Sequence, residues 1–105
     1  MLRNLDELLE SLARENPDAL TLDGLDRALI GRTLPGPNSK AVAVYLWPLA
    51  VQTVLDKMHQ EYEGDGPPPS ESDAEEDLVY NTLGAHVGKD GPIFIEITHR
   101  LAWGD

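Results

Sequence analysis

A glycine-rich segment near the C-terminus has the composition of a phosphate-binding loop. Residues 83–92 read LGAHVGKDGP, so Gly84 is followed by a Gly88-Lys89 pair. A nucleotide-binding P-loop has four residues between its first glycine and Gly-Lys, and then a Ser or Thr that binds magnesium. Here three residues separate Gly84 from Gly88, and Asp90 follows the lysine. Because a carboxylate repels a phosphate, we do not expect nucleotide binding at this segment.

The same segment is typical of a connection between a helix and a strand. Gly84 favours the left-handed conformation that ends many helices. Asp90-Gly91 favours a tight turn before the next strand. Such a loop can still present polar groups to a ligand or partner. The residues that we expect to contribute there are Tyr45, Asn81, His86, Lys89 and Asp90.

The other reactive residue types do not form a catalytic or metal-binding motif. Cysteine is absent, which excludes disulfide bonds, thiolate nucleophiles and cysteine-ligated metals. His59, His86 and His99 fall in separate segments, without the i, i+4 spacing of a helical metal site. No serine lies in a Gly-x-Ser-x-Gly motif. We therefore expect no catalytic residue, no metal and no cofactor, with a carboxylate-based acid–base hydrolase as the enzymatic alternative.

Acidic residues dominate the chemistry of the chain. It has 19 Asp and Glu against 8 Lys and Arg, which gives a net charge of −11. This charge opposes binding to nucleic acids and anionic membranes, and it favours a partner protein with a basic surface. The acidic patch, as we call it, occupies a stretch without Lys or Arg between Lys57 and Lys89. Its members are Glu61, Glu63, Asp65, Glu71, Asp73, Glu75, Glu76 and Asp77.

Local structure explains part of this acidity. Ser72 precedes Glu75 by three residues, which is capping-box spacing, and carboxylates in a first helical turn are stabilised by the helix dipole. Residues 63–71 are rich in Gly and Pro and are typical of a flexible linker. Clustered carboxylates can also imitate a nucleic-acid backbone, which requires a rigid spacing that such a linker does not supply. A solvated linker with a helix cap is the simplest interpretation, and mimicry is an alternative.

Hydrophobic spacing predicts the elements that position these groups. Leucines at three- and four-residue steps predict a first helix that ends at Asn16-Pro17. Apolar residues on both faces of the second strand predict a central place in the sheet. The order helix-strand-strand-helix-helix-strand favours a single α+β domain over residues 1–105, with about three helices packed on a three-stranded sheet. The predicted helices are 2–15, 48–62 and about 73–83, and the predicted strands are 27–33, 40–46 and 92–98.

The chain carries no sign of export. Its N-terminus, MLRNLDELLESLAREN, lacks the basic and then apolar pattern of a signal peptide. No apolar run approaches the roughly 18–20 residues of a membrane span. The absence of cysteine also suits a reducing compartment. We therefore expect a cytoplasmic protein.

Three motifs resemble a family of small bacteriophage and prophage proteins. They are Ala-Leu-Ile-Gly at 28–31, Val-Ala-Val-Tyr at 42–45 and Asn-x-x-Gly-Ala-x-Val-Gly at 81–88, the last followed by a Pro-x-Phe strand. The resemblance covers about residues 25–96. This chain departs from the pattern at Leu46, where an acidic residue is usual, at His86, where an aromatic residue is usual, and in its longer linker. The family has no established activity, so the resemblance implies a phage context and a three-stranded fold but no catalytic residue.

These observations favour a non-enzymatic protein that acts by binding another protein. A phage-encoded modulator of a host factor, such as an anti-defence protein, is the specific form of this hypothesis. The alternative is a small ligand-binding or enzymatic domain that uses the 81–91 loop. The sequence leaves the partner and the oligomeric state open.

Overall fold

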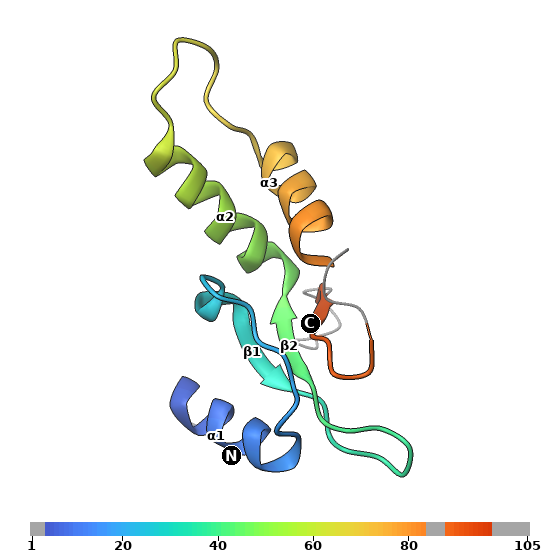
Figure 1. The fold of residues 1–105 in the computed structure, drawn as a ribbon. Coiled ribbons are helices and arrows are strands. Elements are labelled where there is room, and N and C mark those ends of the chain that lie inside the picture. The colour runs from blue at the N-terminus through green and yellow to red at the C-terminus, as the bar shows by residue number, and fades with distance from the viewer. Residues whose placement is uncertain (1–3, 84–87, 98–105) are drawn as a thin grey trace, which may run out of the picture.

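The computed structural model describes residues 4–83 and 88–97, which form an α+β fold (Figure 1). The fold class and the element order predicted from the sequence are confirmed. The elements in chain order are α1 (Leu5–Glu15), the 3₁₀ turn η1 (Asp26–Ala28), β1 (Leu29–Arg32), β2 (Ala43–Leu46), α2 (Trp47–Glu61), α3 (Glu71–Leu78), the π-helical turn η2 (Val79–Leu83) and β3 (Ile93–Ile95).

The central strand of the sheet is β2, as its apolar residues on both faces predict. It pairs antiparallel with β1 and parallel with β3, so the sheet is mixed and has the order β1-β2-β3. A bulge interrupts the antiparallel pair, because Leu29 lies opposite Tyr45 whereas Gly31 lies opposite Val44. The side chains of Ala43 and Tyr45 are fully buried. The sheet therefore holds Tyr45 inside the protein.

Helices α2 and α3 form a hairpin that projects away from the sheet (Figure 1). Trp47 and Pro48 occupy the first turn of α2, where proline is tolerated because its missing N–H needs no partner. The segment between the helices, predicted as a flexible linker at about 63–71, makes one contact with α2 and one with Tyr62, the residue that caps the end of this helix. His59 Nε2 lies 2.8 Å from the carbonyl oxygen of Pro69, and the Tyr62 hydroxyl donates to the carbonyl of Gly66. The hairpin makes the molecule elongated, with extents of 53 × 37 × 23 Å.

The start of α3 differs from the sequence prediction by two residues. Ser70, and not Ser72, is the N-cap, and its capping-box partner is Asp73 instead of Glu75. The Asp73 backbone N–H donates to Ser70 Oγ at 3.4 Å, and the Ser70 N–H donates to Asp73 Oδ2 at 2.8 Å. Both registers satisfy the motif, and the helix begins in the earlier one, directly after the proline run ends.

The core lies where α1, the sheet and the base of the hairpin meet. Phe94 of β3 stacks on Tyr45, with ring centroids 5.5 Å apart, and meets Trp47 edge-on at the same distance. These aromatic contacts join the sheet to the first turn of α2. None of the described helices combines the length and apolarity needed to cross a bilayer. The buried apolar residues of this core are Leu8, Leu12, Leu22, Leu25, Ala28, Leu29, Ala41, Ala43, Tyr45, Ala50, Val51, Ala74 and Leu78.

Candidate functional site

The residues predicted as a ligand or partner loop lie in several different environments. Asn81 lies on η2 and donates from Nδ2 to Asp77 Oδ1 at 2.8 Å. Lys89 is exposed, and Asp90 is half-buried. His86 lies outside the described residues. Tyr45 is fully buried. The described members therefore do not form one ligand-contacting surface.

The prediction that Tyr45 offers its side chain to a ligand is wrong. Its hydroxyl accepts a hydrogen bond from the backbone N–H of Leu22 at 2.8 Å, and its ring stacks on Phe94. Burial raises the pKa of Tyr45 above its ordinary value, and the hydrogen bond from Leu22 opposes this rise. Tyr45 thus fixes the position of the segment that contains Leu22. The sequence could not reveal this role, because a tyrosine on a central strand fits either environment.

The segment before β3 is a turn held by buried Asn16. The Gly91 N–H donates to the Gly88 carbonyl at 3.2 Å, so the expected turn is present. The left-handed backbone of this turn is at Gly88, with φ of +121°. Gly84, the expected end of the helix, lies outside the described residues. Asn16 Nδ2 donates to Asp90 Oδ1 at 3.0 Å and to the Ala41 carbonyl at 2.8 Å.

A cleft of about 390 Å³ lies at the base of the hairpin, between α2, the end of α3 with η2, and the segment 21–25. Among the described members of the predicted loop, Asn81 alone lines it. Its apolar lining comes from Leu22, Leu25, Val54 and Leu78, three of which belong to the core. Polar groups surround this apolar part. They are Thr21, Asp23, Thr53, Lys57, Asp77, Asn81 and Thr82.

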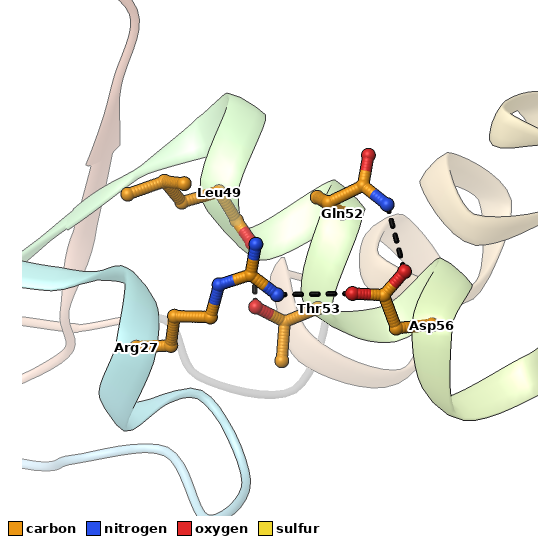
Figure 2. Close-up of polar contacts among 5 residues, drawn as sticks. All are labelled: Arg27, Leu49, Gln52, Thr53 and Asp56. Carbon is orange, nitrogen blue, oxygen red and sulfur yellow. Dashed lines mark hydrogen bonds and ion pairs between the residues drawn. The ribbon is translucent and has the colours of Figure 1, made fainter. Parts of the chain in front are cut away.

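Two interactions lie behind the cleft, one at its 21–25 wall and one at η1, the turn that follows this wall. One is the hydrogen bond from Leu22 to Tyr45. The other is the ion pair between Arg27 of η1 and Asp56 of α2, with 3.0 Å between Nη1 and Oδ2 (Figure 2). Gln52 Nε2 also donates to Asp56 Oδ1 at 2.8 Å. The hydrogen bonds from Gln52 and Arg27 lower the pKa of Asp56 below its ordinary value, and the ion pair joins η1 to α2 at the surface.

The charged groups of the cleft are not neutralised by one another. The side chains of Lys57 and Asp23 have no hydrogen-bond or ion-pair partner among the described residues. Asp77 uses Oδ1 to accept from Asn81 and forms no ion pair within that part of the chain. The cleft therefore presents one ammonium and two carboxylates to solvent.

The acidic patch extends over the outer part of the hairpin. Five of its carboxylates, from Glu71 to Asp77, lie on α3, and Glu61 is the last residue of α2. Only Glu63 and Asp65 lie in the connecting segment. None of the eight carboxylates forms an ion pair within the described residues. Most of the patch therefore has a helical scaffold, as the predicted helices 48–62 and 73–83 indicated, and Glu71 is the one member of the patch that moves from the predicted linker onto a helix.

Within residues 4–83 and 88–97, no group of three His, Asp or Glu side chains is arranged to hold a metal ion. The ring of His59 contacts the Pro69 carbonyl. No protein-family model, curated protein or solved structure matches this chain. The resemblance to bacteriophage proteins therefore stays a prediction.

Sequence reasoning missed the two features that organise the site. Asn16 was interpreted only as a helix stop before Pro17, although its amide joins segments far apart in the sequence. The cleft was missed because its walls come from three separate stretches, each of which has an ordinary composition. One available signal was the isolated Lys57, the last basic residue before a long acidic stretch.

Proposed function

We propose that this chain is a non-enzymatic protein-binding module whose acidic patch docks onto a basic surface of another protein. The observation that carries the proposal concerns the hairpin, which projects away from the sheet (Figure 1). Its eight carboxylates form no ion pair within the described residues. Unpaired surface charge of one sign accelerates encounter with an oppositely charged partner. A nucleic acid is disfavoured as the partner because its phosphates would meet the same carboxylates.

Exposed apolar groups beside the patch support a docking role. Tyr80 is 78% exposed and Val79 is 48% exposed, and both lie on η2, directly after α3. Tyrosine is enriched among the residues that dominate binding energy, because its ring supplies contact area at a low entropic cost. Charge would thus guide the partner to the hairpin, and these two side chains would provide apolar contact.

The proposed partner is a cytoplasmic host protein with a basic surface, in keeping with the resemblance to bacteriophage proteins. Because α3 presents its carboxylates at helical spacing, proteins that bind nucleic acids through Lys and Arg are suitable candidates. The resulting activity would be modulation by occupying the partner's basic site. Catalysis is not part of the proposal.

A charge-matched comparison tests the proposal. The full chain captures partners from bacterial lysate at low salt, and the affinity of each purified partner is then measured by calorimetry. The double variant Glu75→Gln/Glu76→Gln removes two exposed carboxylates from α3 but keeps capping Asp73. We expect it to bind about tenfold more weakly, since two exposed charge contacts are lost.

The control variant Glu10→Gln/Glu15→Gln makes the same change in net charge on α1, away from the hairpin. We expect it to bind like the unmodified chain. Equal weakening by the two double variants would mean that only net charge matters and would refute docking through the patch. Recovery of no partner above the level of an unrelated acidic protein would refute the proposed function itself.

A further inference from the structure

We propose that the cleft at the base of the hairpin binds a small zwitterion that carries an ammonium and a carboxylate on a short apolar skeleton. The cleft is lined by different residues from those that would contact a protein at the outer hairpin, apart from Asp77. The proposal therefore adds a small-molecule site to the protein-binding role and does not depend on it.

The size and construction of the cleft suit a small ligand. Its volume of about 390 Å³ lies within the roughly 300–1,000 Å³ that small-molecule sites occupy. The wall formed by residues 21–25 is held before any ligand binds, because the buried Tyr45 hydroxyl accepts a hydrogen bond from the Leu22 N–H. Thr53, on the α2 wall, donates its hydroxyl proton to the Leu49 carbonyl at 2.6 Å, which leaves the hydroxyl oxygen free to accept (Figure 2). Such preorganisation lowers the entropic cost of binding.

The charges of the cleft define the class of ligand. Lys57 on α2 supplies an ammonium without a partner among the described residues, which suits a ligand carboxylate. Asp23 on the opposite segment and Asp77 on α3 supply carboxylates, which suit a ligand ammonium. Asn81 donates from Nδ2 to Asp77, which leaves its own Oδ1 as a further acceptor. A ligand with both charges satisfies all of these groups, and charge-assisted hydrogen bonds are the strong ones.

The apolar part of the lining suits a short carbon chain. Leu22, Leu25 and Leu78 are each no more than 5% exposed, and Val54 is half-buried beside them. An alkyl group placed against these side chains would be removed from water, which stabilises the complex in proportion to the area buried. A polyanion is disfavoured, because two carboxylates line the cleft and the net charge of the chain is −11.

Three matched probes test the proposal by NMR titration of the full chain, labelled with ¹⁵N, at constant pH. L-Norvaline carries both charges, butylamine lacks the carboxylate, and pentanoate lacks the ammonium. We expect L-norvaline to shift the signals of Asp23, Lys57 and Asp77 with a dissociation constant of about 1 mM. We expect butylamine and pentanoate to bind about tenfold more weakly, since each loses one charge-assisted contact.

Two variants assign the charges, and a third serves as control. Lys57→Met keeps the aliphatic stem of the side chain. We expect this variant to bind L-norvaline as weakly as the unmodified chain binds butylamine. We expect Asp77→Asn to bind L-norvaline as weakly as the unmodified chain binds pentanoate. Lys89→Met removes an exposed ammonium that does not line the cleft and should change nothing. The proposal is overturned if L-norvaline shifts no cleft signal at about 20 mM, if all three probes bind equally, or if Lys57→Met binds L-norvaline as tightly as the unmodified chain.

Discussion

The polar interactions of the protein interior, made by Asn16 and Tyr45, differ in kind from those of the acidic patch. Asn16 and Tyr45 are almost completely buried, and their hydrogen bonds join residues that are 23, 25 and 74 positions apart in the sequence. In the acidic patch, the hydrogen bonds of Asp73 and Asp77 are exposed and span three and four positions. The hydrogen bonds of Asn16 and Tyr45 therefore hold separate segments together, whereas those of the patch only organise their own helix.

This contrast indicates which residues are free to serve binding. When a buried residue that forms a hydrogen bond is removed, the donor or acceptor that it had contacted stays buried without a new partner from water or protein. This destabilises the fold. Losing an exposed carboxylate has little such effect, because water replaces the interaction. The exposed residues of the outer hairpin can therefore be set by a partner, whereas buried Asn16 and Tyr45 are set by the fold.

The largest effect is expected from Asn16→Ala. It removes the donor to the Ala41 carbonyl and to Asp90 Oδ1 and the acceptor for the Asp18 N–H. Because Asn16 is only 1% exposed, we expect a loss of about 3 kcal/mol in the free energy of unfolding, measured with urea. Asn38→Ala, at an exposed position, serves as control and should change it by less than about 0.5 kcal/mol. A loss below about 1 kcal/mol for Asn16→Ala would contradict the view that the buried hydrogen bonds of the interior matter more for folding than the exposed ones of the acidic patch.

A smaller effect is expected from Tyr45→Phe, which keeps the ring stacking on Phe94 but removes the hydroxyl. The N–H of Leu22 then loses its acceptor, and we expect a loss of about 1–2 kcal/mol near neutral pH. Tyr80→Phe, at a position that is 78% exposed, is the matched control and should have no measurable effect. Equal unfolding free energies for Tyr45→Phe and the unmodified chain would show that this hydrogen bond does not hold the wall of the cleft.

The same tyrosine gives a pH dependence with a definite sign. Burial raises the pKa of Tyr45 in the folded protein above its ordinary value of 10.0. Above pH 10 the unfolded chain loses this proton first, so the unfolded state is favoured as the pH rises toward the folded pKa. We therefore expect the unmodified chain to lose stability across this alkaline range, and Tyr45→Phe to lose less of it. Parallel pH profiles for the two proteins would exclude Tyr45 as the source.

The parts of the fold that follow from periodicity were predictable. Leu8 and Leu12 share one face of α1, and the apolar residues of β2 indicated its central position, because both patterns depend only on neighbours in the sequence. The site was less predictable because it depends on contacts between distant segments. Tyr45 was assigned to a binding surface and Asn16 to a helix end, although the partners that fix their roles lie at least 23 positions away.

The smallest effect concerns Ser70 and Ser72, two serines whose surroundings in the sequence both satisfy the capping box. The sequence favoured Ser72 with Glu75, whereas the structure assigns the cap to Ser70 with Asp73. Ser70→Ala removes the acceptor for the Asp73 N–H, and we expect a loss of about 1 kcal/mol in the free energy of unfolding. Ser72→Ala lies within the first turn of α3 and should be neutral or slightly stabilising, since alanine has the higher helix propensity. Both serines are exposed, so burial cannot account for a difference between the losses in unfolding free energy of the two variants. A greater loss for Ser72→Ala would mean that Ser72 is the N-cap, so that α3 begins two residues later and Glu71 no longer belongs to the helical part of the patch that we propose for the partner.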